Sequence, residues 1–246
     1  MYKLLAIEEL LFYTTSMNTI PYETKRQSVA INADLSFTIK SLLDQQQFYD
    51  PQNQAKQLGI CSAAWPIFGM LWPSSIQLAL KLLKYPINED HQILEIGCGL
   101  GIASLTAQSL GYNITASDRH PLAGKFLAKN AHLNDLPNIR FKHAQWGDVP
   151  IPSITDTNAP LLTGNYQHII ASDVLYEPNA AIEVAAFIHE FADEKCTVWI
   201  IDPSRGYHNH FTRAMTEYGF SLEEHIRLTE PVNNEPYKGR LLVYTR

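Results

Sequence analysis

Three closely spaced glycines directly after a short apolar run constrain the fold of this chain more than any other feature. The apolar run is 92–96, and Gly97, Gly99 and Gly101 follow it before a second apolar run begins. Glycine tolerates positive φ and leaves backbone N–H groups uncovered, so a ligand can approach the start of a helix closely. We therefore predict a strand, a turn and a helix that together bind a nucleoside, with Cys98 inside the turn.

The spacing of the glycines is G-x-G-x-G, whereas dinucleotide-binding turns carry G-x-G-x-x-G, and Ile102 stands where that pattern has its third glycine. This motif alone does not exclude the interpretation as a purely structural turn that binds no ligand. A carboxylate about 20 residues further on can accept protons from both ribose hydroxyls. Asp118, which ends the apolar run 112–117 and precedes Arg119, is the predicted ribose ligand. It could also cap the next helix, and the two roles are compatible.

Apolar runs and amphipathic segments alternate from residue 91 onward, which predicts an α/β fold with a parallel, doubly wound sheet. The expected strands are 91–96, 113–117, 138–143, 166–172 and 196–202, and the expected helices are 101–110, 121–133, 180–192 and 206–218. Two final strands, 220–228 and 240–245, are joined by a loop too short for a helical crossover. The last pair should therefore be antiparallel.

The N-terminal quarter of the chain does not show the alternation of strands and helices that begins at residue 91. Apolar residues alternate on both sides of a polar turn within 27–40, which predicts a β-hairpin, and a short helix is expected near the N-terminus. An amphipathic helix is expected over 73–83, with Pro73 in its first turn. We predict a boundary near residue 60, which separates an N-terminal extension, 1–60, from the main domain, 61–246.

Composition limits the kinds of partner. The chain has 246 residues, 46% of them hydrophobic and 18% charged, with a net charge of −6, so phosphate-dominated binding to nucleic acid is not expected. No apolar run approaches the roughly 20 residues that span a bilayer, which predicts no membrane partner. Three scattered cysteines and nine histidines lack metal-ligand spacing, so no metal is predicted. These features favour a soluble, cytoplasmic protein.

Two further segments follow predicted strands and should meet the glycine turn at the carboxyl edge of the sheet. Gln145 offers an amide for an adenine amino group, and Trp146 offers a ring for the purine face, although Trp146 could instead be a core residue. Ser172 and Asp173 end another strand, and Tyr176 follows three residues later. Asp173 could be a helix cap, and Tyr176 a packing residue.

Together, 94–101, Trp146 and the D-x-x-Y tetrad at 173–176 resemble the class I, seven-strand S-adenosylmethionine-dependent methyltransferases, in particular the group that methylates lysine in proteins. The resemblance implies S-adenosylmethionine as cofactor, with Glu95 near its methionine end. It also implies a final strand inserted antiparallel beside the fifth. The segment 68–73 resembles the aromatic-proline segment of the family. The segment 201–205 resembles a D-P-G-R turn, in which Ser204 replaces glycine.

Methyl transfer to an amine requires a lone pair in line with the methyl group and little acid–base machinery. Asp173 is predicted to orient the acceptor or the cofactor, because a carboxylate beside an ammonium ion opposes its deprotonation. Tyr176 is predicted to add an oxygen and an aromatic wall, and Trp72 and Arg205 to lie at the substrate mouth. Trp72 could instead be buried, and Arg205 could meet an acidic protein surface or remain solvated.

Three functions stay open at this point. The first is a protein-lysine methyltransferase, the second a methyltransferase for a small molecule, and the third a cofactor-binding interaction module without catalysis. The D-x-x-Y tetrad favours an amine acceptor, and the intact glycine turn and ribose carboxylate disfavour the third function.

Overall fold

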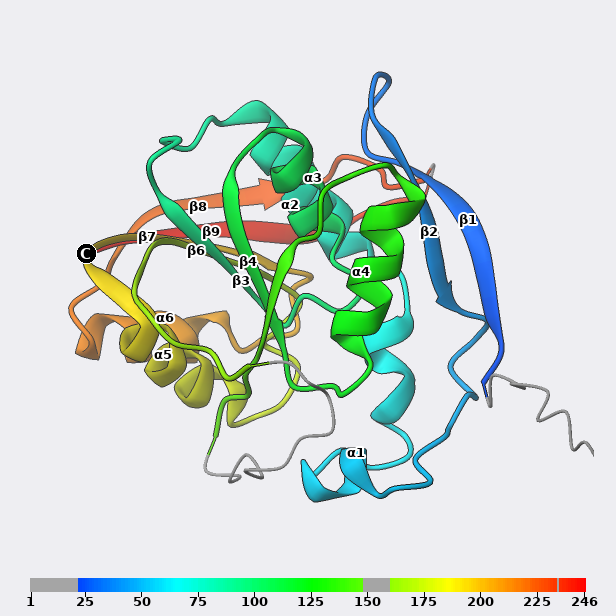
Figure 1. Cartoon of the computed structure of the whole chain (residues 1–246). Helices are drawn as coiled ribbons and strands as arrows, with labels where there is room; N and C mark the ends of the chain where they lie inside the picture. Colours follow the sequence, from blue (N-terminus) through cyan, green and yellow to red (C-terminus); the bar gives the residue numbers. More distant parts are fainter. Residues whose placement is uncertain (1–21, 148–159, 234) are drawn as a thin grey trace, which may run out of the picture.

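A seven-stranded sheet forms the centre of the fold (Figure 1). The computed structural model describes residues 22–147, 160–233 and 235–246, so the helix expected near the N-terminus lies outside them. The strand order is β5-β4-β3-β6-β7-β9-β8. The strands are β3 (Gln92–Ile96), β4 (Asn113–Asp118), β5 (Arg140–His143), β6 (Tyr166–Ser172), β7 (Ala192–Asp202), β8 (Ser221–Leu228) and β9 (Gly239–Thr245).

Strands β3 to β7 are parallel, and β9 runs antiparallel between β7 and β8. The predicted doubly wound sheet and the antiparallel insertion beside its fifth strand are confirmed. One strand differs in length: β7 begins at Ala192, four residues before the predicted start. The polar residues at the start of β7 do not predict a buried strand from the sequence. In the structure, Arg246 holds this start by donating hydrogen bonds to the carbonyl oxygens of Ala192 and Asp193.

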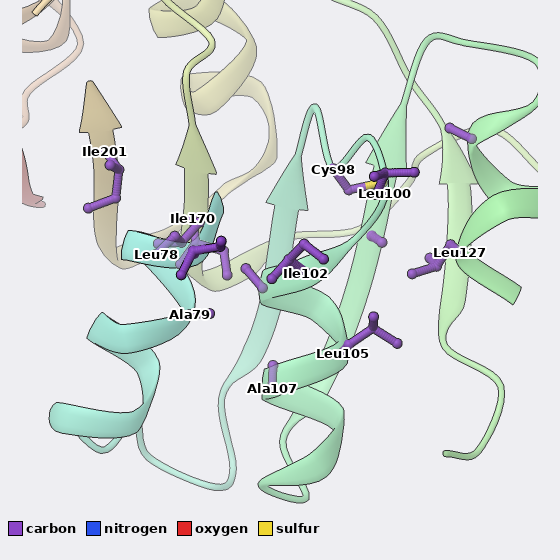
Figure 2. Close-up of a cluster of buried hydrophobic side chains, with 14 of the residues drawn as sticks. Leu78, Ala79, Cys98, Leu100, Ile102, Leu105, Ala107, Leu127, Ile170 and Ile201 are labelled. Atoms are coloured by element: carbon purple, nitrogen blue, oxygen red, sulfur yellow. The ribbon is translucent and has the colours of Figure 1, made fainter. Parts of the chain in front are cut away.

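Helices cover both faces of the sheet. On one face lie α2 (Pro73–Lys84), α3 (Ile102–Ser109) and α4 (Ala123–Leu133), and on the other α5 (Ala180–Phe191) and α6 (His208–Glu217). Side chains of α2 and α3, among them Leu78 and Leu105, gather over the strands that carry Ile170 and Ile201 (Figure 2). The neighbouring Ile169 and Ile200 belong to the core under α5 and α6. Burial on both faces explains why these strands read as continuous apolar runs.

The predicted hairpin is present as β1 (Thr24–Ala30) and β2 (Ser36–Leu42), and it lies against α4. The side-chain oxygens of Asn134 and Asn130 accept hydrogen bonds from the backbone N–H groups of Thr38 and Lys40, at 2.7 and 2.8 Å. Apolar side chains of the hairpin join the core under α2 to α4. The boundary near residue 60 stays a prediction.

A short helix, α1 (Gln54–Gln57), and a 3-10 helix, η1 (Trp65–Gly69), connect the hairpin to α2. Within the described ranges, no helix has the length and apolar character needed to cross a membrane.

Candidate active site

A cavity of about 290 Å³ opens at the carboxyl edge of the sheet, beside β3, where the strand order reverses. Ligands bind at this kind of position in open α/β sheets. The loops after β3, β4, β5 and β6 form one side of the cavity, and the segment around η1 forms the other. Its lining includes Ile60, Phe68, Trp72, Gly97, Cys98, Gly99, Asp118, Arg119, His120, Trp146, Ser172, Asp173, Tyr176 and Arg205.

Glycine is required at the turn after β3 for two reasons. Gly97 and Gly99 have φ of 62° and 52°, which disfavours other residues. A Cβ atom on Gly97 would also lie 3.2 Å from the Trp146 ring, and one on Gly99 would lie 3.0 Å from the carbonyl oxygen of Phe68. The turn thus brings bare backbone to the cavity, as predicted.

The third glycine has another role. Gly101 does not line the cavity. It precedes α3 with φ of 76°, and a Cβ atom there would lie 2.2 Å from Cδ1 of Leu127 on α4. The prediction that Gly101 contacts the cofactor is not supported by this placement, because its free space is taken by the packing of α3 against α4.

Glu95 also lies away from the cavity wall, although the resemblance places it near the cofactor. Its carboxylate is 1% exposed and accepts hydrogen bonds from both the backbone N–H and the hydroxyl of Ser104. Burial raises the pKa of Glu95 to about 7. Glu95 therefore fixes the start of α3, and its influence on the cavity is indirect.

Asp118 does not cap α4, which begins at Ala123 without a side-chain cap, and its role as ribose ligand stays a prediction. It lines the cavity at the end of β4. Its two carboxylate oxygens accept hydrogen bonds from the backbone N–H groups of Gly99 and His120, each at 2.8 Å. Burial raises the pKa of its carboxyl group, while these two hydrogen bonds lower it. Asp118 therefore holds the glycine turn in place and still borders the space where a ribose could bind. Arg119 lines the same space.

The segment after β5 is divided between the cavity and the interior. Trp146 lines the cavity, and its ring packs edge-on against Phe187 of α5, with ring centroids 6.2 Å apart. Gln145 is buried at 8% exposure and does not line the cavity. The predicted contact of Gln145 with adenine is thus not supported by its position, whereas Trp146 borders the cavity and its contact with a purine stays a prediction.

Sequence reasoning missed a pair of stacked rings in the cavity wall. Phe68 of η1 and His120 lie parallel, with ring centroids 3.7 Å apart. Nδ1 of His120 accepts a hydrogen bond from the N–H of Leu122, and burial lowers the pKa of this histidine well below its usual value, so the ring is neutral. The aromatic cluster of 65–72 was the available signal, but the sequence did not show what it packs against.

Asp173 and Tyr176 lie together at the carboxyl end of β6. The Asp173 backbone is in the left-handed region, with φ of 56°, and its N–H donates to the carbonyl oxygen of Ile201 at 2.8 Å. Tyr176 lines the cavity, and burial raises the pKa of its phenol. Residues separated by two positions in the tetrad thus reach the same space.

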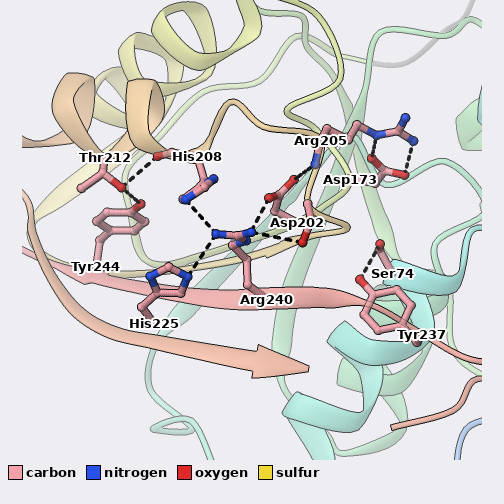
Figure 3. A network of polar contacts seen from close by, with 11 residues as sticks. Ser74, Asp173, Asp202, Arg205, His208, Thr212, His225, Tyr237, Arg240 and Tyr244 are labelled. Atoms are coloured by element: carbon pink, nitrogen blue, oxygen red, sulfur yellow. Dashed lines mark hydrogen bonds and ion pairs between the residues drawn. The ribbon is translucent and has the colours of Figure 1, made fainter. Parts of the chain in front are cut away.

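Arg205 binds Asp173 directly. Nε and Nη2 of Arg205 donate to Oδ1 and Oδ2 of Asp173 at 2.5 and 2.8 Å (Figure 3). Two parallel hydrogen bonds of this kind form a strong and oriented ion pair. Arg205 therefore neither remains simply solvated nor stands free to meet an acidic protein surface, the two alternatives that the sequence left open.

A second hollow of about 320 Å³, named here the outer hollow, adjoins the cavity. The two spaces share Trp72, Asp173 and Arg205, so the ion pair lies in the partition between them. Trp72 is half-buried, and its indole N–H donates to the carbonyl oxygen of Ile67 at 2.9 Å. The outer hollow is further lined by Pro73, Ser74, Pro203, Ser204, Tyr237 and Lys238. Trp72 and Arg205 thus lie where the cavity and the outer hollow meet, and their place at a substrate mouth stays a prediction.

A polar network beneath the partition holds the loop that carries Arg205 (Figure 3). The buried carboxylate of Asp202 faces Nε of Arg240 at 3.5 Å, and Nη2 of Arg240 donates to Oγ of Ser204 at 3.2 Å. Arg240 also contacts ring nitrogens of His208 and His225, at 2.7 and 3.2 Å. No motif in the sequence indicated this network, because its members come from β7, α6, β8 and β9.

The cavity suits a nucleoside-bearing sulfonium cofactor. It offers uncovered backbone at the glycine turn, a carboxylate at Asp118 and an aromatic ring at Trp146. Nε2 of His120 is buried without a hydrogen-bond partner among the described residues, so it is available to a bound ligand. These groups match a ribose, a purine and their polar substituents.

The sheet order, the cavity and the carboxylate after β4 define a class I S-adenosylmethionine-dependent methyltransferase fold. The ribosomal protein L11 methylase from Lactobacillus delbrueckii subsp. bulgaricus has this fold, with a TM-score of 0.57 and 15% identity, over 89% of this chain and 98% of that one. The sequence profile of the lysine methyltransferase family matches residues 56–217. This chain therefore belongs to the lysine methyltransferase family, and the predicted resemblance is confirmed.

Two curated relatives show the range of similarity. The protein-lysine methyltransferase METTL21E of Bos taurus is 27% identical over 177 residues, which cover 69% of this chain and 59% of that relative. The electron transfer flavoprotein beta subunit lysine methyltransferase of Rattus norvegicus is 27% identical over 143 residues, covering 57% of this chain and 51% of the relative. The matched region thus spans between half and three-fifths of these relatives.

Proposed function

We propose that this protein transfers a methyl group from S-adenosylmethionine to the side-chain nitrogen of lysine in a protein. The observation that carries the proposal is the position of Asp173 in the partition between the cavity and the outer hollow. Membership of the lysine methyltransferase family supports the reaction class. The similarity to the bovine protein-lysine methyltransferase and to the rat methyltransferase of a flavoprotein subunit supports a protein acceptor.

The cofactor side of the site is assigned to Gly97, Cys98, Gly99, Asp118, Arg119, Trp146 and Ser172, which all line the cavity. Glu95 and Gly101 support these residues from behind, through α3. When bound, S-adenosylmethionine supplies an electrophilic methyl group on a sulfonium. Phe68, His120 and Trp146 give this space an aromatic wall, and electrostatic interactions are stronger beside such low-dielectric surfaces than in bulk water.

The acceptor side is assigned to the outer hollow. Trp72, Pro73, Pro203 and Tyr237 give it apolar surfaces that suit the aliphatic stem of a lysine. The amine then reaches Asp173 and Tyr176, which orient its lone pair. Deprotonating a lysine with a pKa of about 10.4 costs roughly 4 to 5 kcal/mol at neutral pH, so the site must favour the neutral amine. Transfer needs no further base once the proton has left.

The proposal includes a protein acceptor in preference to nucleic acid, and a cytoplasmic location. The net charge of −6 supports the first point, because phosphate binding favours basic proteins. The three free cysteines, Cys61, Cys98 and Cys196, support the second, because disulfides are rare in the reducing cytosol.

Radiolabelled S-adenosylmethionine, incubated with the purified protein and an undermethylated extract of its source, tests the proposal. We expect label in a discrete protein band, and methyllysine in its acid hydrolysate. Asp173→Ala should lose this label, whereas Asp90→Ala, which removes an exposed carboxylate in the loop before β3, should keep it. Label confined to small molecules would contradict the proposal, and so would a failure to bind the cofactor.

A further inference from the structure

The charge of Asp173 is already compensated in the structure. Both of its oxygens accept hydrogen bonds from the guanidinium of Arg205, at 2.5 and 2.8 Å. The Asp173 side chain is 11% exposed, while that of Arg205 is 39% exposed. A carboxylate paired in this way keeps its orientation but presents little net negative charge to a group that approaches it.

Arg205 is held in place by contacts on the other side of its loop. Its backbone N–H donates to Asp202 Oδ1 at 3.4 Å, and Asp202 in turn faces Arg240. The preceding residue, Ser204, has φ of 67°, and its hydroxyl accepts from Arg240 (Figure 3). The framework therefore aims the guanidinium at Asp173 within the partition between the cavity and the outer hollow.

The other charged and titratable groups that line the two spaces add no second uncompensated carboxylate. On the cavity side, Arg119 lies near Asp118, and both line the space with Tyr176 and the neutral His120. On the side of the outer hollow, burial raises the pKa of Tyr237 to about 12, so Tyr237 is neutral, and Lys238 adds one exposed positive charge. The exposed carboxylate of Glu177 acts on Tyr176 but lines neither space. Among the residues that line the two spaces, Arg205 thus decides whether an uncompensated carboxylate faces the acceptor.

This balance matters because the acceptor must lose a proton before it can react. A free carboxylate within about 4 to 6 Å of an ammonium ion raises the pKa of that ion by about 1 to 3 units. A guanidinium at the same place opposes this effect. Asp173 alone would therefore bind the lysine well and hold it in the unreactive form.

We propose that Arg205 is a positioning residue that neutralises Asp173, so that this carboxylate orients a lysine acceptor without holding it as an ammonium ion. The inference rests on the proposed function. The proton leaves the ammonium for water, and the nitrogen lone pair then forms the N–C bond. The C–S bond breaks, its electron pair stays on sulfur, and the positive charge passes to nitrogen.

The pH profile of methyl transfer tests this role in wild type, Arg205→Gln and Arg205→Lys. The acceptor is the unmethylated form of the protein that becomes labelled in the extract experiment. For Arg205→Gln we expect the rising limb of the turnover profile to move upward by about 1 to 2 pH units, with a loss of about 10- to 100-fold at pH 7.5 that shrinks toward pH 9.5. Arg205→Lys should stay within about half a unit of wild type, because it keeps the charge.

Two further variants separate this role from a structural one. The double variant Asp173→Asn, Arg205→Gln removes both charges, so the rising limb of its pH profile should return toward the wild-type position. Arg213→Gln, an exposed arginine on α6, should leave the profile unchanged. Binding of n-butylammonium, a copy of the lysine side chain, provides a readout without methyl transfer. At pH 7.5 it should bind Arg205→Gln at least about tenfold more tightly than wild type.

The outcomes distinguish this inference from the proposed function. A wild-type reaction that yields no methyllysine contradicts the proposed function. If methyllysine forms but the rising limb of the pH profile of Arg205→Gln coincides with that of wild type, the role of Arg205 is contradicted. A loss of equal size at every pH, or equal binding of n-butylammonium, contradicts it too.

Discussion

The two halves of the carboxyl edge hold their carboxylates in different ways. Near the ends of β3 and β4, Glu95 and Asp118 accept hydrogen bonds from backbone N–H groups that are two, nine and nineteen residues away. After β6 and β7, Asp173 pairs with the side chain of Arg205, and Asp202 with that of Arg240. The first half, which borders the proposed cofactor space, is thus held mainly by main-chain donors. The second half, which borders the proposed acceptor space, is held mainly by side-chain ion pairs.

The backbone shows the same contrast. Positive φ in the first half falls on Gly97, Gly99 and Gly101, where it costs little. In the second half it falls on Gly206 but also on Asp173 and Ser204, where a side chain makes it unfavourable. Such strain persists only where surrounding contacts maintain it, and it is common at functional sites. The difference teaches that a cofactor turn can be encoded locally, whereas the acceptor side depends on contacts between distant segments.

The largest effect is expected where the first half packs against α4. Gly101→Ala would combine a left-handed backbone with a Cβ atom 2.2 Å from Leu127, and we expect a loss of about 4 kcal/mol in the free energy of unfolding. Urea unfolding measures it. Gly111→Ala is the matched control, because it shares positive φ but meets nothing within 4 Å. Equal losses would show that packing against α4 is not what requires glycine at 101.

The next effect concerns the buried carboxyl group of the first half. Because the pKa of Glu95 is raised from 4.5 to about 7, folding retains a proton that the unfolded chain loses above pH 4.5. Stability from this group is therefore full below pH 4.5 and declines as the pH rises through 7. Glu95→Gln should be more stable than wild type by about 3 kcal/mol at pH 8, and the gain should shrink toward pH 5.

Urea unfolding of both proteins at pH 5, 6.5 and 8 measures this difference. Glu89→Gln, which changes an exposed carboxylate before β3, should show no such dependence on pH. A gain for Glu95→Gln that does not vary with pH would mean that Glu95 is ionised throughout this range.

A smaller effect tests the ligand role of the first half. Asp118→Ala removes a carboxylate that lines the cavity and supports the glycine turn, so the affinity for S-adenosylmethionine should fall about 30-fold, or about 2 kcal/mol. Isothermal titration calorimetry measures the affinity. Asp173→Asn should alter it less, since Asp173 is assigned to the acceptor half. Similar losses of affinity for S-adenosylmethionine in both variants would contradict the proposed division into a cofactor half and an acceptor half.

The smallest effect sharpens the contrast in backbone strain. Ser204→Gly and Ser204→Ala both lose the hydroxyl that accepts from Arg240, but only glycine relieves the left-handed φ of 67°. Ser204→Gly should therefore be more stable than Ser204→Ala by about 1 kcal/mol in thermal or urea unfolding. Equal stability of the two variants would indicate that the backbone at 204 is not strained.

Sequence reasoning succeeded where the signal was local. The strands and helices from 91 onward, the hairpin, and the cavity positions of Asp118, Trp146 and Asp173 follow from periodicity, glycine spacing and the ends of apolar runs. It did not separate Glu95, Gly101 and Gln145, which do not line the cavity, from their neighbours in β3, the glycine turn and the loop after β5, some of which do. Adjacent positions on a turn point in different directions, so spacing alone could not separate them.

The sequence by itself determined the alternating α/β order, the antiparallel final strand and the glycine turn, because each depends on the local pattern of apolar residues and on the conformational freedom of glycine. Only the tertiary structure decided the stack of Phe68 on His120, the pair of Asp173 with Arg205, and the anchoring of that pair by Arg240. These contacts join segments that the sheet brings together from distant parts of the chain. Their energies depend on distance and orientation in space, which no local pattern specifies.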